Sequence, residues 1–413
     1  MSNASRILIA LAAGLLLGIA AAAFDPAVAG RIADVADPVG GLWLNGLTMT
    51  VVPLVVALLV VGIAQTAEAA RAGAIAGRAL AWIVAVMSLS AVVGALVLPT
   101  LVSLFPMPVE AAQALKGAIT GAKEVPTVPP FSEFLRGIVP NNPIHAAAEM
   151  QILPLIIFTG VFAFALTRLP PDSRNVLVRF FQATADAMLI VIDWVLKLAP
   201  IGVFALAFVV GARSGGAAFQ ALLHYVLMLI LVGITITVLA YFVALVAARW
   251  TPGRFVREVA PVQALAVSTQ SSLACLPIML NKTKALGVAP ATADVTLPMA
   301  VALLRATGPA MNIAVALYVA NWYGVALGPA QYAIAVVAAV LTSMGAVSLP
   351  GQVSFVTSIA PICLTLGVPV EPLALLIAVE TLPDIFRTLG NVTMDVAVTG
   401  AVARQSHTLE EPA

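Results

Sequence analysis

Apolar residues run along this chain in stretches that are long for the core of a soluble domain. Each stretch exceeds the roughly 17 residues that an α-helix needs to cross a bilayer. Between residues 106 and 142 the chain turns polar and rich in proline, which predicts an extramembrane loop. The pattern predicts an all-α polytopic membrane protein, and the crossings expected in its first part cover residues 6–24, 40–66, 78–105, 144–167, 176–212 and 216–248.

After residue 252 the pattern changes, because Pro, Gly, Ser and Thr interrupt the apolar segments. Basic residues flank the first of these segments on both sides, so we expect it to enter the membrane and return on the same side. No Lys or Arg occurs between residues 306 and 386, which is typical of loops on the outer side. An inverted repeat with broken segments at matching positions indicates a binding site near the bilayer midplane. The predicted order is hairpin, helix, hairpin, helix, over residues 258–280, 289–322, 329–366 and 370–404.

The basic residues of the first six crossings predict the orientation. If the N-terminus is cytoplasmic, most of them lie on the cytoplasmic side, as the positive-inside rule requires. We therefore expect a multi-pass protein of a bacterial-type inner (plasma) membrane, and we interpret residues 6–24 as its first helix rather than as a signal peptide. The cytoplasmic set is Arg6, Arg71, Arg78, Arg168, Arg174, Arg179, Arg249, Arg254 and Arg257, and the outer set is Arg31, Lys116, Lys123, Arg136 and Arg213.

Composition agrees with lipid as the solvent. Of the 413 residues, 62% are hydrophobic and 9% are charged, whereas a soluble domain has about 25% charged residues. The net charge of +1 gives no sign of a nucleic-acid partner. The two cysteines, Cys275 and Cys363, offer neither a disulfide framework nor a metal cluster.

Small and hydroxyl residues mark the expected tips of both hairpins, within Ser268–Pro277 and Ser343–Gly351. The half-helix that follows each tip presents free N–H groups and the positive end of its dipole, which suit an anion. The alternative is an ordinary kinked helix with Ser and Gly at a packing interface. Non-helical backbone at membrane depth needs protein or a water-filled cavity around it, and two such tips in repeat positions favour a binding function.

The last helix carries a polar stripe. At about 100° per residue its members fall on one face, and because each charge at the bilayer centre costs about 2.5–3.5 kcal/mol, that face must meet protein or water. The alternative is a salt-bridge ladder that only joins helices, as we expect for Asp193 and Lys197. The stripe consists of Glu380, Asp384, Arg387, Asn391 and Asp395, with Thr388 at its edge.

Prolines and an arginine make two further positions unusual. Pro383 precedes Asp384 and frees the carbonyl of Val379. In the segment 289–322, Arg305 precedes a Gly308-Pro309 pair that we expect to break the helix and free carbonyl oxygens for a cation. A simple proline kink is the alternative.

Together these features resemble those of the glutamate/aspartate transporter family, the dicarboxylate/amino acid:cation symporters. The resemblance covers nearly the whole chain, and the most specific motif is the one in the last helix. The matching stretches are Val52-Pro53-Leu54-Val55 with Val60-Val61-Gly62, Asn142-Pro143 with Gln151-Ile152-Leu153-Pro154, Ala199-Pro200-Ile201-Gly202-Val203-Phe204, the Ser-rich first hairpin, Pro350-Gly351, and Arg387-Thr388 with Asn391-Val392-Thr393 and Asp395.

The resemblance implies an elevator-type homotrimer with eight transmembrane helices and two re-entrant hairpins in inverted repeat. A transport domain would then move against a fixed scaffold. The scaffold would hold residues 1–74 (helices 1 and 2) and 106–213 (helices 4 and 5 with the outer loop), and the transport domain would hold residues 75–105 (helix 3) and 214–413.

The resemblance also implies roles for individual residues. Arg387 would hold the substrate's side-chain carboxylate, Asp384 its ammonium, and Glu380 would orient the arginine. Asn391 would contact both substrate and sodium, with Asp395 as a sodium ligand. The other implied substrate contacts are Ser271, Ser272, Leu349, Pro350, Gly351 and Thr388, and the other implied cation ligands are Asn312 and Ser343.

This chain departs from the family pattern around the expected sodium sites. The motif of the seventh helix lacks its aspartate, and the third helix offers only Ser88 and Ser90 in place of a tyrosine pair. We therefore hypothesise that Arg305 is a fixed cation that replaces one sodium ion, with a nearby carboxylate such as Asp395 as its partner. The alternative is that Arg305 reaches toward the cytoplasmic interface and anchors the helix.

These features predict a secondary active symporter that imports glutamate or aspartate with Na⁺ or H⁺ and needs no organic cofactor. A C4-dicarboxylate:cation symporter is the alternative, and a passive channel stays open because broken helices also line pores. A primary pump is disfavoured because the chain has no nucleotide-binding loop. An intramembrane hydrolase would need a base beside the hairpin serines, but the histidines, His145, His224 and His407, all lie outside the hairpins.

Overall fold

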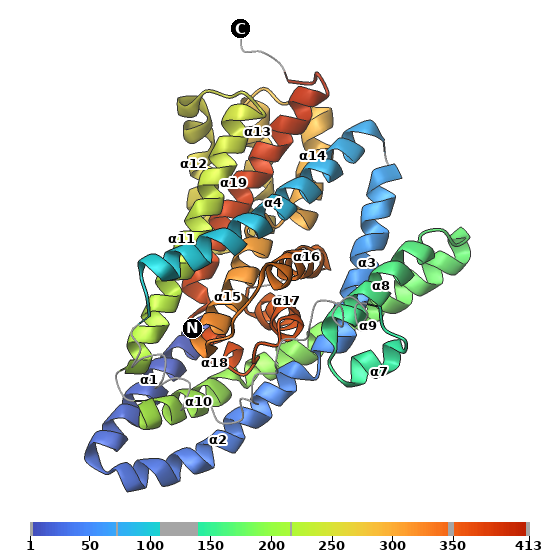
Figure 1. Cartoon of the computed structure of the whole chain (residues 1–413). Helices are drawn as coiled ribbons and strands as arrows, with labels where there is room; N and C mark the ends of the chain where they lie inside the picture. The colour runs from blue at the N-terminus through green and yellow to red at the C-terminus, as the bar shows by residue number, and fades with distance from the viewer. Residues whose placement is uncertain (1–2, 72, 108–138, 215–216, 346–350, 410–413) are drawn as a thin grey trace.

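A computed structural model of the chain describes residues 3–71, 73–107, 139–214, 217–345 and 351–409, and these residues fold into helices with no strand among them (Figure 1). The all-α prediction is confirmed. The helices are α1 (Asn3–Phe24), α2 (Pro26–Thr48), α3 (Val51–Arg71), α4 (Ala74–Leu104), α7 (Pro143–Ala148), α8 (Ile152–Leu166), α9 (Pro171–Lys197), α10 (Ala199–Ser214), α11 (Ala217–Val246), α12 (Pro252–Thr269), α13 (Ser272–Ala285), α14 (Pro290–Leu303), α15 (Thr307–Tyr323), α16 (Pro329–Gly345), α17 (Gly351–Thr365), α18 (Leu373–Val379) and α19 (Thr381–Gln405).

Two of the apolar stretches that we expected to be single crossings are divided between consecutive helices. Residues 40–66 belong to α2 and α3, and residues 176–212 belong to α9 and α10. A proline stands in the first turn of the second helix in each case, Pro53 in α3 and Pro200 in α10. Proline is tolerated there because the first turn has free N–H groups anyway, so it favours a new helix start. Five spans of the described residues are long and apolar enough to cross a bilayer.

The first predicted hairpin is confirmed, and it is longer than the segment 258–280. The helices α12 and α13 pack against each other and are joined by Gln270, in the left-handed conformation (φ 50°), and Ser271. The pair lies beside the C-terminal half of α19 (Figure 1). The second pair, α16 and α17, also packs together and lies beside α15, while the link at 346–350 falls outside the described residues.

The seventh segment is broken as predicted, but at a different place. The helices α14 and α15 are separated by Leu304–Ala306, and Arg305 there has a positive φ of 33°. Gly308 and Pro309, which we expected to form the break, instead lie in the first turn of α15. Pro309 is accommodated at that place because the first turn has free N–H groups.

A second break lies near the start of the last helix. The helices α18 and α19 meet at Glu380, whose N–H makes only a long hydrogen bond of 3.4 Å to the Ile377 carbonyl. Pro383 has no N–H to donate to the carbonyl of Val379 four residues earlier. The irregular turn therefore falls where the sequence places its proline, and it positions Glu380 at the junction.

Two sets of close helix contacts stand out, and α3 joins them by packing on α16 as well. In the first set, α1 packs on α10, α10 on α2, and α3 on α8 and α9. In the second set, α4 packs on α15, α11 on α19, and α14 on α19. The second set contains every residue of the polar stripe.

The contact between α4 and α15 is close and allows a stability prediction. A Cβ at Gly94 would lie 2.5 Å from the carbonyl oxygen of Ala310 and 2.6 Å from its Cα, whereas a Cβ at Gly77, on the same helix, would meet nothing within 4 Å. We expect Gly94→Ala to cost about 1–3 kcal/mol through overpacking, and Gly77→Ala to be neutral or slightly stabilising. Thermal unfolding midpoints of the purified proteins in detergent measure this. Equal midpoints for the two variants would contradict the close packing.

Candidate functional site

The guanidinium group of Arg387 is the centre of a buried polar cluster. It donates from Nη2 to Glu380 Oε1 at 2.7 Å and from Nη1 to Asn312 Oδ1 at 3.0 Å, and its Nε lies 3.6 Å from Asp384 Oδ1. Only 8% of Arg387 and 1% of Glu380 are exposed. We call Glu380, Asp384, Arg387 and Asn312 the arginine cluster.

The break between α18 and α19 explains how two carboxylates reach one guanidinium. Glu380 stands at the junction, seven residues before Arg387, and Asp384 stands one turn before it. Two carboxylates held against one arginine leave the group with a formal charge of −1. The second oxygen of Glu380, Oε2, is buried without a hydrogen-bond partner, so the cluster is not fully satisfied by protein groups alone.

All five members of the polar stripe are buried, as is Thr388. The stripe therefore faces protein rather than lipid, as the cost of burying charge requires. The stripe also contains part of the salt-bridge ladder that we considered as the alternative, because Arg387 pairs with Glu380 and Asp384. Asp193 and Lys197 form the exposed i,i+4 pair that we expected, at 2.7 Å.

The break between α14 and α15 is held by hydrogen bonds from distant helices. The Thr307 N–H donates to Asn391 Oδ1 at 2.8 Å, and its hydroxyl lies 2.8 Å from the same oxygen and 2.9 Å from the Arg387 carbonyl. The hydroxyl of Ser90 on α4 donates to the carbonyl of Ala306. Sequence reasoning assigned no role to Thr307. Its position between Arg305 and the Gly308-Pro309 pair is the signal that could have identified it.

These hydrogen bonds occupy oxygen atoms that the resemblance assigns to sodium. Asn391 Oδ1 has two donors of Thr307 beside it, and Asn312 Oδ1 accepts from Arg387. Asn312 also reaches Ser343, with Nδ2 3.5 Å from the hydroxyl. The structure thus brings Asn312 and Ser343 together, but their polar atoms serve protein partners.

Asp395 has a different environment. It is 1% exposed, and its Oδ1 has no hydrogen-bond partner. It forms no ion pair with any described residue, so the expected pairing of Arg305 with Asp395 is not formed. The charges that act on Arg305 are instead those of Arg387 and Asp384.

The hairpin tips are described only in part. Ser271 caps α13, and its hydroxyl accepts from the Ala274 N–H at 3.3 Å, while Ser272 begins the helix. The first N–H groups of this helix have no partner within it, and the Ser271 hydroxyl satisfies one of them. Leu349 and Pro350 lie outside the described residues, and Gly351 is the first residue of α17.

A second network missed by the sequence analysis links the first hairpin to α19. Gln263 on α12 donates to Thr393 on α19 at 2.9 Å and to the hydroxyl of Tyr241 on α11 at 3.0 Å. These bonds fix the hairpin against the helix that carries Arg387. A single amide among apolar residues gives little signal in a sequence.

The comparisons with known proteins agree with this arrangement. Residues 4–405 match the profile of the Sodium:dicarboxylate symporter family. The chain is 28% identical to the proton/glutamate-aspartate symporter of Escherichia coli, with 98% of this chain and 93% of the relative aligned. It is 26% identical to the C4-dicarboxylate transport protein of Laribacter hongkongensis (98% and 90%). It is 27% identical to the proton/sodium-glutamate symport protein of Bacillus caldotenax (92% and 89%).

The match extends over almost the whole chain and includes every described element from α1 to α19. The family consists of transporters, which rules out the intramembrane hydrolase that we considered. The protein is a multi-pass membrane transporter, and it belongs to the sodium:dicarboxylate symporter family.

Proposed function

We propose that this protein imports an acidic amino acid, glutamate or aspartate, together with a cation. The observation that carries the proposal is the buried guanidinium of Arg387 with Asp384 one turn away, 3.6 Å from its Nε. A guanidinium recognises a carboxylate through two parallel hydrogen bonds. The neighbouring carboxylate complements an ammonium group, so the pair suits a zwitterion that carries an extra acid.

The remaining implied contacts fit the same substrate. The N-terminus of α13, where Ser271 is the cap and Ser272 the first helical residue, supplies N–H groups for the main-chain carboxylate of the substrate. Asn391 and Thr388 lie on the same helix within one turn of Arg387. In this arrangement Glu380 keeps the guanidinium in place through its 2.7 Å bond.

Competition between aspartate and succinate tests the substrate class. Succinate has no ammonium, so it would leave the carboxylate of Asp384 uncompensated in a buried site. Hydrogen bonds to charged groups contribute about 1.5–3 kcal/mol, so we expect succinate to compete at least about tenfold more weakly than aspartate. Uptake of labelled aspartate into proteoliposomes, with each compound as competitor, measures the ratio.

The variant Asp384→Asn serves as the control for that experiment. It should weaken aspartate more than succinate, because only the amino acid uses the charge. Equal competition by the two compounds in the wild type would instead favour a C4-dicarboxylate symporter. Two observations favour that candidate. One is the name of the Laribacter relative. The other is that the charges of Arg305 and Asp384 interact, so Arg305 would offset part of the negative charge that repels a dianion.

The coupling ion is part of the proposal. We propose Na⁺ or H⁺, and the relatives carry both ions in their names. The oxygen of Asp395 that lacks a partner is the described group best suited to a cation. Arg305 acts in this proposal as a fixed positive charge that moves with the substrate site and replaces one co-transported ion.

The assembly and the movement are also proposals. We propose a homotrimer in the inner membrane with a cytoplasmic N-terminus, in which residues 75–105 and 214–413 move as a transport domain against residues 1–74 and 106–213. The close packing of α1 and α2 on α10, and of α3 on α8 and α9, supports this division, and α3 also packs on α16 across the proposed boundary.

A further inference from the structure

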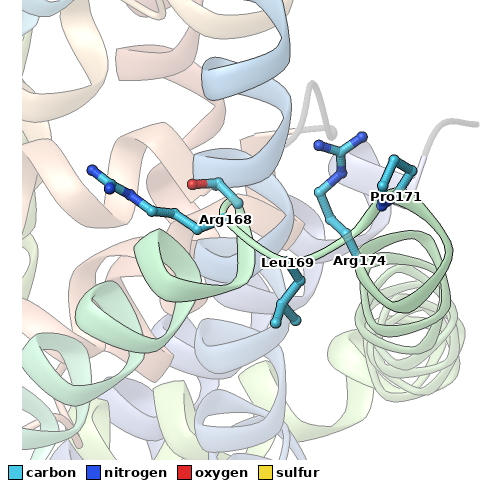
Figure 2. Close-up of a pocket in the computed structure, with 5 residues that line it drawn as sticks. Arg168, Leu169, Pro171 and Arg174 are labelled. Atoms are coloured by element: carbon cyan, nitrogen blue, oxygen red, sulfur yellow. The ribbon is translucent and has the colours of Figure 1, made fainter.

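The link between α8 and α9 contains a cationic cavity, far along the chain from the arginine cluster. The cavity has a volume of about 620 Å³ and is lined by Thr167, Arg168, Leu169, Pro171 and Arg174 (Figure 2). In Figure 2 the side chain of Arg168 extends to the left, that of Arg174 points upward, and Leu169 points downward. Neither arginine side chain forms an ion pair or hydrogen bond with a described residue.

The local sequence explains why both arginines lie at this link. Thr167 ends α8, with its hydroxyl donating to the Phe164 carbonyl at 2.7 Å, and the pair Pro170-Pro171 then forces a new helix to start. Arg174 follows in the first turn of α9, where its N–H donates to the Pro170 carbonyl at 3.0 Å. Side chains on a helix tilt toward its N-terminus, so Arg174 leans back over the link that carries Arg168.

The charge of this cavity has one sign. Its lining contains two arginines and no carboxylate. The acid in the first turn of α9, Asp172, is exposed and does not line the cavity. Two guanidinium groups without a protein acceptor favour an oxyanion, and arginine matches the geometry of phosphate through paired hydrogen bonds.

Exposed apolar side chains lie along both helices that meet at the cavity. Phe164 on α8 and Phe180 on α9 are 65% and 62% exposed, and Val161 and Val176 are exposed beside them. Only 11% of the apolar window of α9 is buried inside the protein. A cationic cavity of this volume at the end of two exposed apolar faces fits a phospholipid, with room for the headgroup in the cavity and for acyl chains along the helices.

We infer that this cavity binds the phosphate of an anionic phospholipid headgroup. The arginines hold the phosphate, and the acyl chains lie against Phe164 and Phe180. This inference is independent of the proposed substrate and coupling ion, because none of its residues belongs to the arginine cluster. The lipid fixes the end of the α8–α9 pair at the membrane surface.

The test uses the full chain, purified in a neutral detergent, and counts bound lipids by native mass spectrometry during titration with phosphatidylglycerol. We expect the double variant Arg168→Ala/Arg174→Ala to weaken binding at least about tenfold, or about 1.4 kcal/mol. The variant Arg179→Ala is the matched control, because Arg179 is an exposed arginine of the same helix that does not line the cavity. It should change binding less than about twofold.

Two further arms identify the ligand. Zwitterionic phosphatidylcholine should bind more weakly than phosphatidylglycerol, and 10 mM inorganic phosphate should leave phosphatidylglycerol bound. Displacement by inorganic phosphate would overturn the lipid assignment and identify a site for soluble phosphate. Equal lipid binding by wild type and the double variant would overturn the site itself.

Discussion

Replacing Arg387 by alanine is expected to abolish uptake of glutamate and aspartate. Its guanidinium group is the described cation whose hydrogen bonds organise the buried cluster, with Glu380 at 2.7 Å and Asn312 at 3.0 Å. Truncating one partner of a buried charged pair costs at least about 2 kcal/mol, so substrate affinity should fall at least about 30-fold. Uptake of labelled glutamate into proteoliposomes gives the result directly, and Arg387→Cys should behave alike while admitting neutral amino acids.

Loss of folding must be separated from loss of recognition. The single variant leaves Glu380 buried without its cation, which is itself destabilising. The double variant Arg387→Ala/Glu380→Gln removes that charge, and it should restore the thermal midpoint without restoring uptake of acidic substrates. Arg404→Ala, at the end of the same helix, is the control and should transport normally. An Arg387→Ala protein that takes up glutamate with unchanged affinity would show that the arginine does not bind the substrate.

The polar stripe of the last helix could be predicted from sequence because it depends on one helix alone. A period of 3.6 residues places Asp384, Arg387, Asn391 and Asp395 on one face, and the cost of charge in lipid requires that face to be buried. The structure buries all of them. The first helix pair was predictable for a related reason, because basic residues at both ends of the segment indicate that the chain turns back on itself there.

The break in the seventh segment could not be placed as well. Gly308-Pro309 is the strongest local signal for a break, yet the chain turns at Leu304–Ala306 and accommodates the proline in the next helix. The bonds that hold this turn come from Asn391, 84 residues away, and from Ser90, 216 residues away. Contacts over such separations depend on how helices rotate against one another, which a local pattern does not contain.

The partner expected for Arg305 shows the same limit. An arginine at membrane depth needs a carboxylate, and several acids of α19 satisfy that requirement in sequence. Arg305 has a positive φ in the turn, and its charge interacts with that of Asp384. Conformations with positive φ are uncommon for residues other than glycine, so no propensity argument would have predicted this turn.

The sodium dependence of substrate binding is expected to be shallow. A tenfold rise in sodium changes substrate affinity about tenfold when one ion is coupled and about a hundredfold when two are coupled. The oxygen atoms of Asn391 and Asn312 already face donors of Thr307 and Arg387, and among the four residues assigned to sodium Asp395 keeps a buried oxygen without a partner. We therefore expect at most a tenfold change in aspartate affinity between 10 and 100 mM Na⁺, measured by calorimetry on the purified protein.

The variant Arg305→Ala tests whether a fixed charge replaces an ion. Removing it should lower affinity in low sodium and steepen the sodium dependence, because a free cation must then supply the missing charge; Arg305→Lys, which keeps the charge, should resemble the wild type. An acidic amino acid carries a charge of −1, so one transported cation makes its import electroneutral, and each further cation would add about 2.3 kcal/mol of driving force per 100 mV. Since Arg305 returns with the protein in every cycle, its charge contributes to substrate binding and nothing to accumulation. A steep, multi-ion sodium dependence in the wild type, unchanged in the alanine variant, would refute this role.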